Sequence, residues 1–503
     1  VGYNSLLNNT TGTRNVAIGA VALDNGNANN DTVAIGYASL SNTSNTSAGN
    51  TAVGSFSLLS NTGSNNVAVG LCSLCANTTA SNNTAVGTLV LSSNTTGTNN
   101  VAIGDRALYT NTASYNTSVG FFSLAANTTG ASNTAVGQNS LAANTTGTNN
   151  IAVGANALDS NTTGGYSVAI GNGSLGLHTT GSSNTAVGWN SGAATTTGAR
   201  NTFVGGGSGV GNGASNTTGD DNSFFGNDAG ARNTTGANHV AVGRDALFTN
   251  TTGNSNVALG FQSLRANTTA SNNTAIGTNA LLSNTTGTQN FAAGSNSLAD
   301  NTTGSNNVSI GTDTLDANTT ANNNTAVGKA ALTANTTGSS NTAVGFNSLP
   351  ANTTASGNVA IGDDSLQKNT TGACNVAVGQ NSLRCNTTGG SNTAVGQSAL
   401  CSHTTSGSNT GIGRCSLRAV TTGGTNTAIG AETMSDLTTG TGNVAIGIAS
   451  GADGMVNISG SNSNRGAFGH NGITNAYVKV AWTVTSDARD KMNFESVPHG
   501  LDF

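Results

Sequence analysis

The side chains best suited to acid–base catalysis are few in this sequence and are scattered along it. The five histidines have no fixed spacing to a carboxylate or a cysteine; they are His178, His239, His403, His470 and His499. Asp220-Asp221 and Asp363-Asp364 are adjacent in sequence, whereas glycoside cleavage needs two carboxyl groups about 5–10 Å apart. Because side chains alternate along an extended chain, each pair points apart. We expect solvated surface here and no enzyme in the repeat region.

The six cysteines form no disulfide framework in so long a chain. Cys72 and Cys75 have C-x-x-C spacing, but no second pair follows at the spacing of a zinc site. Cys385 and Cys401 fall at neighbouring positions of successive repeat units, so a disulfide between them and free thiols are the two alternatives. No metal and no cofactor are predicted.

Aromatic residues supply the candidate binding surface. They stand one or two places after a glycine that recurs about every 17 residues, at positions that also accept Arg244 and Lys329 and are therefore expected to be exposed. Sugar rings stack on such aromatic rings; the alternative is that the rings cover gaps at a seam between chains. The candidates are Tyr37, Phe121, Phe122, Trp189, Phe261 and Phe346, with Tyr3 and Phe56 at equivalent positions.

Composition excludes several classes of protein. Charged residues make up 7% of the 503 residues and the net charge is −5, which argues against nucleic-acid binding, because that needs clustered Lys and Arg. No apolar run approaches the ~18 residues of a membrane span, and glycine does not recur at every third residue as in collagen. Residue 1 is not Met and lies inside the repeat, so both ends are expected to be cut from a longer chain.

The organising feature is an internal repeat. The glycine that ends each Ala-Val-Gly or Ala-Ile-Gly triplet, here position 0, occurs 27 times from Gly2 to Gly447, and 22 of the 26 intervals are 17 residues long. Position −1 is nearly always Val or Ile, position +4 is Leu in 22 units, and position −4 is Asn in 23. Short strands separated by turns at this period predict an all-β parallel β-solenoid of about 27 coils, roughly 130 Å long.

Neighbouring coils bring identical residues together. The Asn at −4 is therefore expected to form a hydrogen-bonded ladder. Ala at −2 and the small residue at +3 suit a close-packed wall, and the alternation of Thr with Val at −3 suggests an inward or neutral face. Burying two large apolar side chains per coil gives less free energy than the conformational entropy lost when 17 residues are ordered. Lateral association into a homo-oligomer is therefore expected, because it would bury a second face.

Asn-Thr-Thr occurs 17 times and formally satisfies the N-glycosylation rule. In register these asparagines would stack about 4.8 Å apart, closer than branched glycans tolerate, so a turn-and-ladder role is favoured over sparse modification.

The repeat is interrupted between Gly188 and Gly230. Leu at +4 becomes Gly192, Gly209 and Gly230, while Ala at −2 becomes Phe203 and Phe224, so volume lost on one wall is restored from the other. A repacked stretch of rod is favoured over a ligand pocket.

Asn-x-Ala-Val/Ile-Gly-x-x-Ser/Ala resembles the head repeat of YadA-type trimeric autotransporter adhesins. The resemblance covers roughly 90% of the chain and implies a left-handed β-roll assembled as a homotrimer. The Asn-Thr-Thr-Gly half of the unit departs from that family's shorter repeat.

The C-terminal tail has a different character. Ser486-Asp487-x-Arg489-x-Lys491, with Val497 to Phe503, resembles the start of the intramolecular chaperone domain of endosialidase-type tailspikes and tail fibres. The resemblance implies self-cleavage of the Ser486–Asp487 bond, with Ser486 as nucleophile and Lys491 as base. The expected domains are a shaft over 1–451, a β-rich neck over 452–485 and a truncated chaperone domain over 486–503.

These patterns predict a structural and adhesive fibre: a homotrimeric viral or phage tail fibre that displays a surface for a host receptor or glycan, on the virion or outside the cell. A cellular extracellular adhesin or surface filament is the alternative. A tailspike glycan hydrolase is disfavoured by the lack of paired acids. An ice-binding solenoid is disfavoured because Thr353 and Thr354 face opposite ways. Membrane insertion is not expected.

Overall fold

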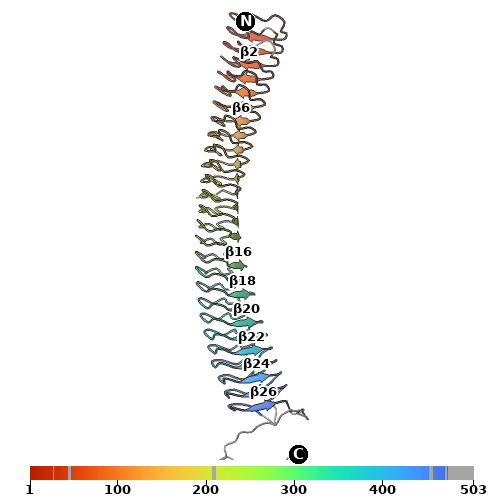
Figure 1. The fold of residues 1–503 in the computed structure, drawn as a ribbon, viewed down its shortest axis with the longest axis vertical. Helices are drawn as coiled ribbons and strands as arrows, with labels where there is room; N and C mark the ends of the chain where they lie inside the picture. The colour runs from red at the N-terminus through yellow and green to blue at the C-terminus, as the bar shows by residue number, and fades with distance from the viewer. Residues whose placement is uncertain (27, 43–46, 207–210, 453–456, 471–472, 474–503) are drawn as a thin grey trace, which may run out of the picture.

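The computed structural model describes residues 1–26, 28–42, 47–206, 211–452, 457–470 and 473. Figure 1 shows a gently curved rod in which short strands are stacked along the long axis, one per coil. Each strand pairs in parallel with the next, in register: Thr325 lies beside Thr342, and Val327 beside Val344. The predicted all-β parallel solenoid is confirmed, and the described residues contain no helix.

The 27 strands have three residues each and one common register. They are β1 (Val16–Ile18), β2 (Val33–Ile35), β3 (Thr51–Val53), β4 (Val67–Val69), β5 (Thr84–Val86), β6 (Val101–Ile103), β7 (Thr117–Val119), β8 (Thr134–Val136), β9 (Ile151–Val153), β10 (Val168–Ile170), β11 (Thr185–Val187), β12 (Thr202–Val204), β13 (Ser223–Phe225), β14 (Val240–Val242), β15 (Val257–Leu259), β16 (Thr274–Ile276), β17 (Phe291–Ala293), β18 (Val308–Ile310), β19 (Thr325–Val327), β20 (Thr342–Val344), β21 (Val359–Ile361), β22 (Val376–Val378), β23 (Thr393–Val395), β24 (Thr410–Ile412), β25 (Thr427–Ile429), β26 (Val444–Ile446) and β27 (Gly466–Phe468).

The last strand extends the solenoid beyond the expected end of the shaft. β27 pairs in parallel with β26, so one irregular coil follows residue 451. Most of the expected neck after it, and the whole of 486–503, lie outside the described residues.

The repeated glycine permits close stacking of coils. Gly277 has φ +128°, and a Cβ built on it would lie 2.6 Å from the carbonyl oxygen of Gly294 in the next coil. That distance is well inside van der Waals contact, and the backbone conformation is one that side chains with a Cβ rarely adopt. Position 0 therefore tolerates no larger residue.

Each coil has two arms: the strand is the first, and the segment from +1 to +6 is the second. The backbone of the second arm has positive φ at two of its positions. Leu281 at +4 and Asn279 at +2 both have positive φ, 51° and 57°, a region that costs a non-glycine residue roughly 1 kcal/mol or more. With positive φ at +2 and +4, backbone N–H groups of this arm point towards the coil before and the coil after. Asn279 donates to the carbonyl of Phe261 at 3.0 Å, and Leu281 donates to that of Ser297 at 3.1 Å. The arm thereby hydrogen-bonds to the coils before and after it.

The core lies between the two arms. Ala at −2, the small residue at +3 and Leu at +4 are buried in almost every coil, as Ala275, Ala280 and Leu281 illustrate. The inward Leu row is confirmed, whereas the small residues at −2 and +3, expected to form a close-packed wall, line the core of the single chain. The strand's other two residues point outward: Ile276 at −1 is 40% exposed, and Thr274 at −3 is half-buried. Of the inward or neutral face expected at −3, the inward alternative is wrong, because the space opposite Leu admits only the small side chain at −2.

Candidate functional site

The two asparagine rows are interior ladders. At −4, the backbone N–H of Asn341 donates to Oδ1 of Asn324 at 2.9 Å. At +7, Nδ2 of Asn352 donates to Oδ1 of Asn335 at 2.8 Å and to the carbonyl of Ala355 at 3.0 Å. The predicted −4 ladder is confirmed: backbone N–H groups donate to the side-chain oxygens, and in several coils the side-chain amides also bond, as Nδ2 of Asn409 does to Oδ1 of Asn392 at 3.2 Å. Asn352 begins an Asn-Thr-Thr triplet and is fully buried, so a glycan on Nδ2 would replace both of its hydrogen bonds.

Three histidines occupy asparagine positions in these ladders. His178 stands at +7, where Nδ1 lies 3.0 Å from Oδ1 of Asn161 and Nε2 lies 3.0 Å from Nδ2 of Asn184. An amide oxygen only accepts and an amide nitrogen only donates, so the ring is neutral with its proton on Nδ1. Burial lowers the pKa of His178 to about 4. His239, at −4, accepts from the Asn256 N–H at 3.1 Å, and burial also lowers its pKa to about 4.

His403 completes this group and has a backbone partner. It stands at +7, with Nε2 2.7 Å from the carbonyl of Ser406, and burial lowers its pKa. All three histidines are fully buried and hydrogen-bonded within the ladders, so the expectation of solvated surface was wrong for them.

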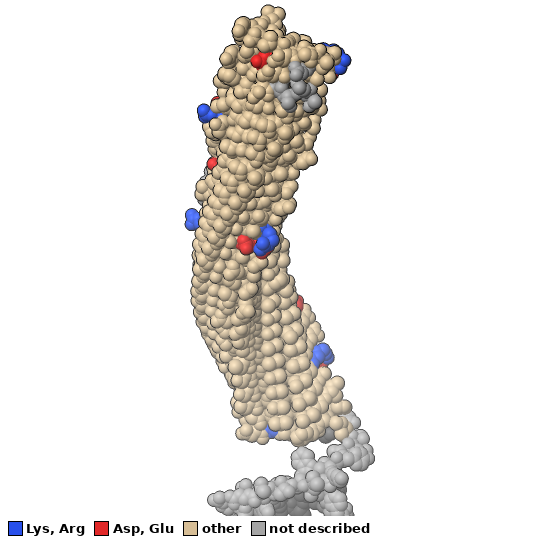
Figure 2. Space-filling model, turned by 45° about the horizontal axis from the view of Figure 1, so that its top comes forward, with Lys and Arg blue, Asp and Glu red and all other residues tan. Residues whose placement is uncertain are grey.

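The outward face of the sheet carries one continuous apolar stripe, defined here as position −1 of all coils and flanked by Val, Ile, Phe or Thr at nearly every −3 position. Position −1 is apolar in every described strand, and its side chains are 46% exposed at Ile18, 42% at Ile446 and 61% at Phe468. At about 40 Å² per coil, the stripe exposes on the order of 10³ Å² of apolar surface, more than the few hundred Å² usual for a soluble monomer. Figure 2 shows that charged side chains are sparse on the visible surface of the rod. The sequence showed the apolar row at −1, but the sequence interpretation did not assign that row to a face of the sheet.

The predicted aromatic residues are exposed, except for the half-buried Phe122, and they do not form one site. Tyr37 contacts Phe56 edge-on with ring centroids 5.3 Å apart, and Phe121 contacts Phe122 at 4.5 Å. Phe122 is also covered by Arg106, and Phe261 by Arg244. Trp189 and Phe346 are 46% and 56% exposed on coils of their own.

The interrupted stretch is repacked as predicted. Phe203 and Phe224 are fully buried. A Cβ on Gly192 would lie 2.5 Å from the Phe203 ring, and one on Gly230 would lie 2.3 Å from that of Phe224. The middle glycine of the prediction needs correction: Gly209 lies outside the described residues, and Gly213 takes the Leu position, donating to the carbonyl of Ala229. The four extra residues of this interval therefore precede Gly211.

A surface hollow of about 520 Å³ lies beside this stretch, on the second arm. Glycine and alanine at +5 and +6 leave space that Arg or Phe fills elsewhere, while Asn156, Asn190 and Asp159 supply polar groups. Burial raises the pKa of the Asp159 carboxyl. The hollow is lined by Asn156, Asp159, Gly173, Gly176, Leu177, Asn190, Ala193, Ala194, Ala214 and Ser215.

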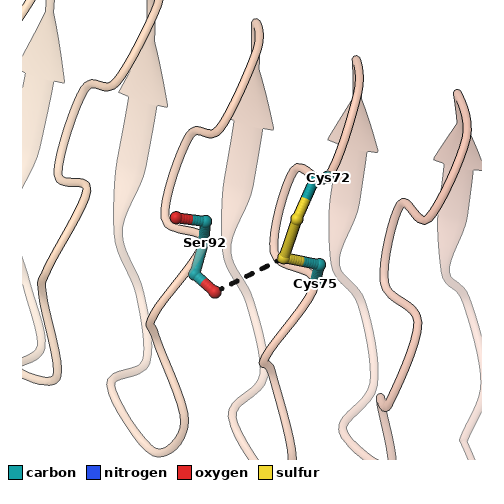
Figure 3. The surroundings of a disulfide bond; sticks show 3 residues. All are labelled: Cys72, Cys75 and Ser92. Atoms are coloured by element: carbon teal, nitrogen blue, oxygen red, sulfur yellow. Dashed lines mark hydrogen bonds between the residues drawn. A yellow bond between two sulfur atoms is a disulfide. The ribbon is translucent and has the colours of Figure 1, made fainter.

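The cysteines differ from the prediction at one place. Cys72 and Cys75 form a disulfide with Cα atoms 4.9 Å apart, and the Cys75 Sγ lies 3.6 Å from the Ser92 carbonyl of the next coil (Figure 3). The C-x-x-C spacing was the signal, because positions +2 and +5 meet across the turn within disulfide range. Cys385 and Cys401 are free thiols.

The paired aspartates have structural partners. Asp221 forms an ion pair with Arg200 at 2.6 Å, and Asp364 accepts from Nδ2 of Asn347 at 2.7 Å. Within the described ranges, no group of three or more His, Cys, Asp or Glu side chains could hold a metal ion. Ser486, Asp487 and Lys491 lie outside the described residues.

No helix in the described part of the chain is long and apolar enough to cross a membrane. Comparison with models of known protein families and with curated proteins finds no match for this chain.

Proposed function

We propose that this chain is the shaft of a structural and adhesive fibre, assembled from three copies, of the kind found in viral or phage tail fibres. The observation that carries the proposal is the apolar stripe on a rod with few charges. Its area, on the order of 10³ Å², is close to the ~800 Å² that one partner contributes to a standard protein interface. A stripe on one side of each rod suits closed symmetry about a common axis, and the likeness to trimeric adhesin heads favours three copies.

Light scattering tests the assembly. The folded wild type should have three times the chain mass of 49.1 kDa. Replacing Ile310 and Ile361 together by Asp places charges in the stripe without entering the core, and should give folded single chains with an unchanged β circular dichroism spectrum. Thr354→Asp, on an exposed row away from the strand, should still give trimers. A single-chain mass for folded wild type would refute the proposal.

A cellular surface adhesin is the alternative, because the same rod would serve it equally well. The gene upstream of Val1 separates the two: a virion-attachment domain supports the tail fibre, and a secretion signal supports the adhesin.

For the tail, the resemblance of Ser486-Asp487-x-Arg489-x-Lys491 supports self-cleavage. A neutral Lys491 amine would take the hydroxyl proton of Ser486, whose oxygen then attacks the carbonyl carbon of the Ser486–Asp487 bond. The C–N bond breaks as the Lys491 ammonium returns the proton to the leaving amine of Asp487, and water hydrolyses the strained four-membered lactone that is left on Ser486. Desolvation would favour the neutral amine.

A further inference from the structure

A cation–aromatic stack occupies three successive coils next to the hollow. The guanidinium carbon of Arg232 lies 5.2 Å from the centre of the Phe248 ring, and that of Arg265 lies 5.6 Å from it. The two arginines approach from the coils before and after Phe248, which places them on the order of 10 Å apart, two coil spacings. Neither has an ion-pair partner among the described residues, unlike Arg200 and Arg414.

Stacking prepares these arginines to bind an anion. A guanidinium lying on an aromatic ring is held by cation–π attraction and keeps its N–H edge free. That edge is the part that pairs with a carboxylate or sulfate through two parallel hydrogen bonds. On a chain with 7% charged residues, two unpaired guanidinium groups this close are a distinct positive feature.

The stack adjoins the hollow at one end. Ser215, which lines the hollow, donates its N–H to the carbonyl of Ala231 in the next coil, and Arg232 follows Ala231 directly. Hollow and stack therefore share the +5 and +6 rows. Together they offer amide and carboxylate groups at Asn156, Asp159 and Asn190, and positive charge two to six coils further on, so a ligand that reaches both must extend beyond the hollow along the rod.

This surface faces away from the apolar stripe. Side chains at +4 and −2 meet in the core between the arms, as the 2.5 Å from a Cβ on Gly192 to Phe203 shows. The hollow lies on the outer side of one arm, and the stripe lies on the outer side of the other. Lateral assembly through the stripe would leave the hollow and the stack open.

We propose that the hollow and the Arg232–Phe248–Arg265 stack form a binding groove for an acidic oligosaccharide. The ligand's hydroxyl and amide groups bind Asn156, Asp159 and Asn190, while its carboxylate or sulfate groups bind the two arginines. A volume of about 520 Å³ accommodates two or three sugar rings, within the range of ligand sites. The inference rests on the proposed adhesive role but not on trimer formation, since one chain supplies the whole groove.

Binding to immobilised oligosaccharides tests the groove. The probes are a hyaluronan hexasaccharide, which carries carboxylates, a heparin hexasaccharide, which also carries sulfates, and chitohexaose, which carries neither. Wild type should bind at least one acidic probe, more weakly as salt is raised, and should bind chitohexaose less well. Replacing Arg232 and Arg265 together by Ala should weaken binding by about tenfold or more, as expected from the loss of charge-assisted hydrogen bonds.

Two variants separate groove binding from general charge attraction. Ala193→Phe fills the hollow without changing charge, at a +5 position where Phe248 is tolerated, and should weaken binding of the acidic probe. Arg418→Ala removes an exposed +5 arginine from a distant coil and should have no effect. The inference is overturned if no acidic probe binds, if chitohexaose binds as well, or if Arg418→Ala matches the double variant. Light scattering on each sample keeps these outcomes distinct from failure of assembly.

Discussion

The sharpest test of the ladder interpretation is the pH dependence that His178 gives to the free energy of unfolding. The free imidazole has a pKa near 6.5, and burial lowers that of His178 to about 4 in the folded chain. Above pH 6.5 both states are neutral and the histidine makes no pH-dependent contribution. As pH falls below 6.5, the unfolded chain binds a proton that the folded chain does not, so the free energy of unfolding falls.

The size of the effect follows from the shift. Each pH unit between 6.5 and 4 should cost about 1.4 kcal/mol, so the loss reaches roughly 3 kcal/mol near pH 4 and is constant below it. The side chain is fully buried and its contacts are amides, so solvent screening and neighbouring charges reduce this little. His178→Asn restores the usual ladder residue and should remove the loss.

Urea unfolding at pH 7.5, 5.5 and 4.0 measures the difference between the two proteins. Tryptophan fluorescence in a Trp482→Phe background reports on Trp189, one coil away, which matters because a solenoid can unfold locally. The difference in unfolding free energy should change by roughly 3 kcal/mol across this range in favour of His178→Asn. In a regular stretch, Asn335→His should introduce a matching acid sensitivity. A difference that stays constant with pH would refute the reasoning.

The remaining predictions concern the core and the tail. Leu281→Asp places an unpaired charge in the buried row and should destabilise the solenoid by more than about 4 kcal/mol in urea unfolding, whereas Lys329→Asp, at an exposed position, should stay within about 0.5 kcal/mol; a large loss at Lys329 would contradict the assignment of inside and outside. Phe203→Ala should cost about 3–5 kcal/mol, because Gly192 and Gly213 leave no Leu to fill the space; a neutral result would mean that the stretch collapses. In the full-length gene product, wild type should release a piece beginning at Asp487, and mass spectrometry should find Ser486→Ala and Lys491→Ala uncut; equal cleavage of both would assign it to another protease.

Sequence alone determined the architecture, because the repeat constrains every coil in the same way. The glycine at position 0, the Leu row represented by Leu281 and the two Asn rows predicted the period, the inward Leu row and the ladders. It also predicted that Phe203 and Phe224 replace lost Leu volume, since those changes occur together along the chain.

The alternation of side chains along a strand does not say which of its two faces is buried, and the tertiary structure decided this. A strand with period two has two faces, and only the narrow gap opposite Leu281 selects Ala275 for the core and turns Ile276 outward to form the stripe. Contacts between coils cannot be read from a single repeat unit either. Gly213, rather than Gly209, takes the Leu position because the inserted residues precede Gly213. The stack of Arg232 and Arg265 on Phe248 exists because residues 16 and 17 places apart lie one coil rise from each other.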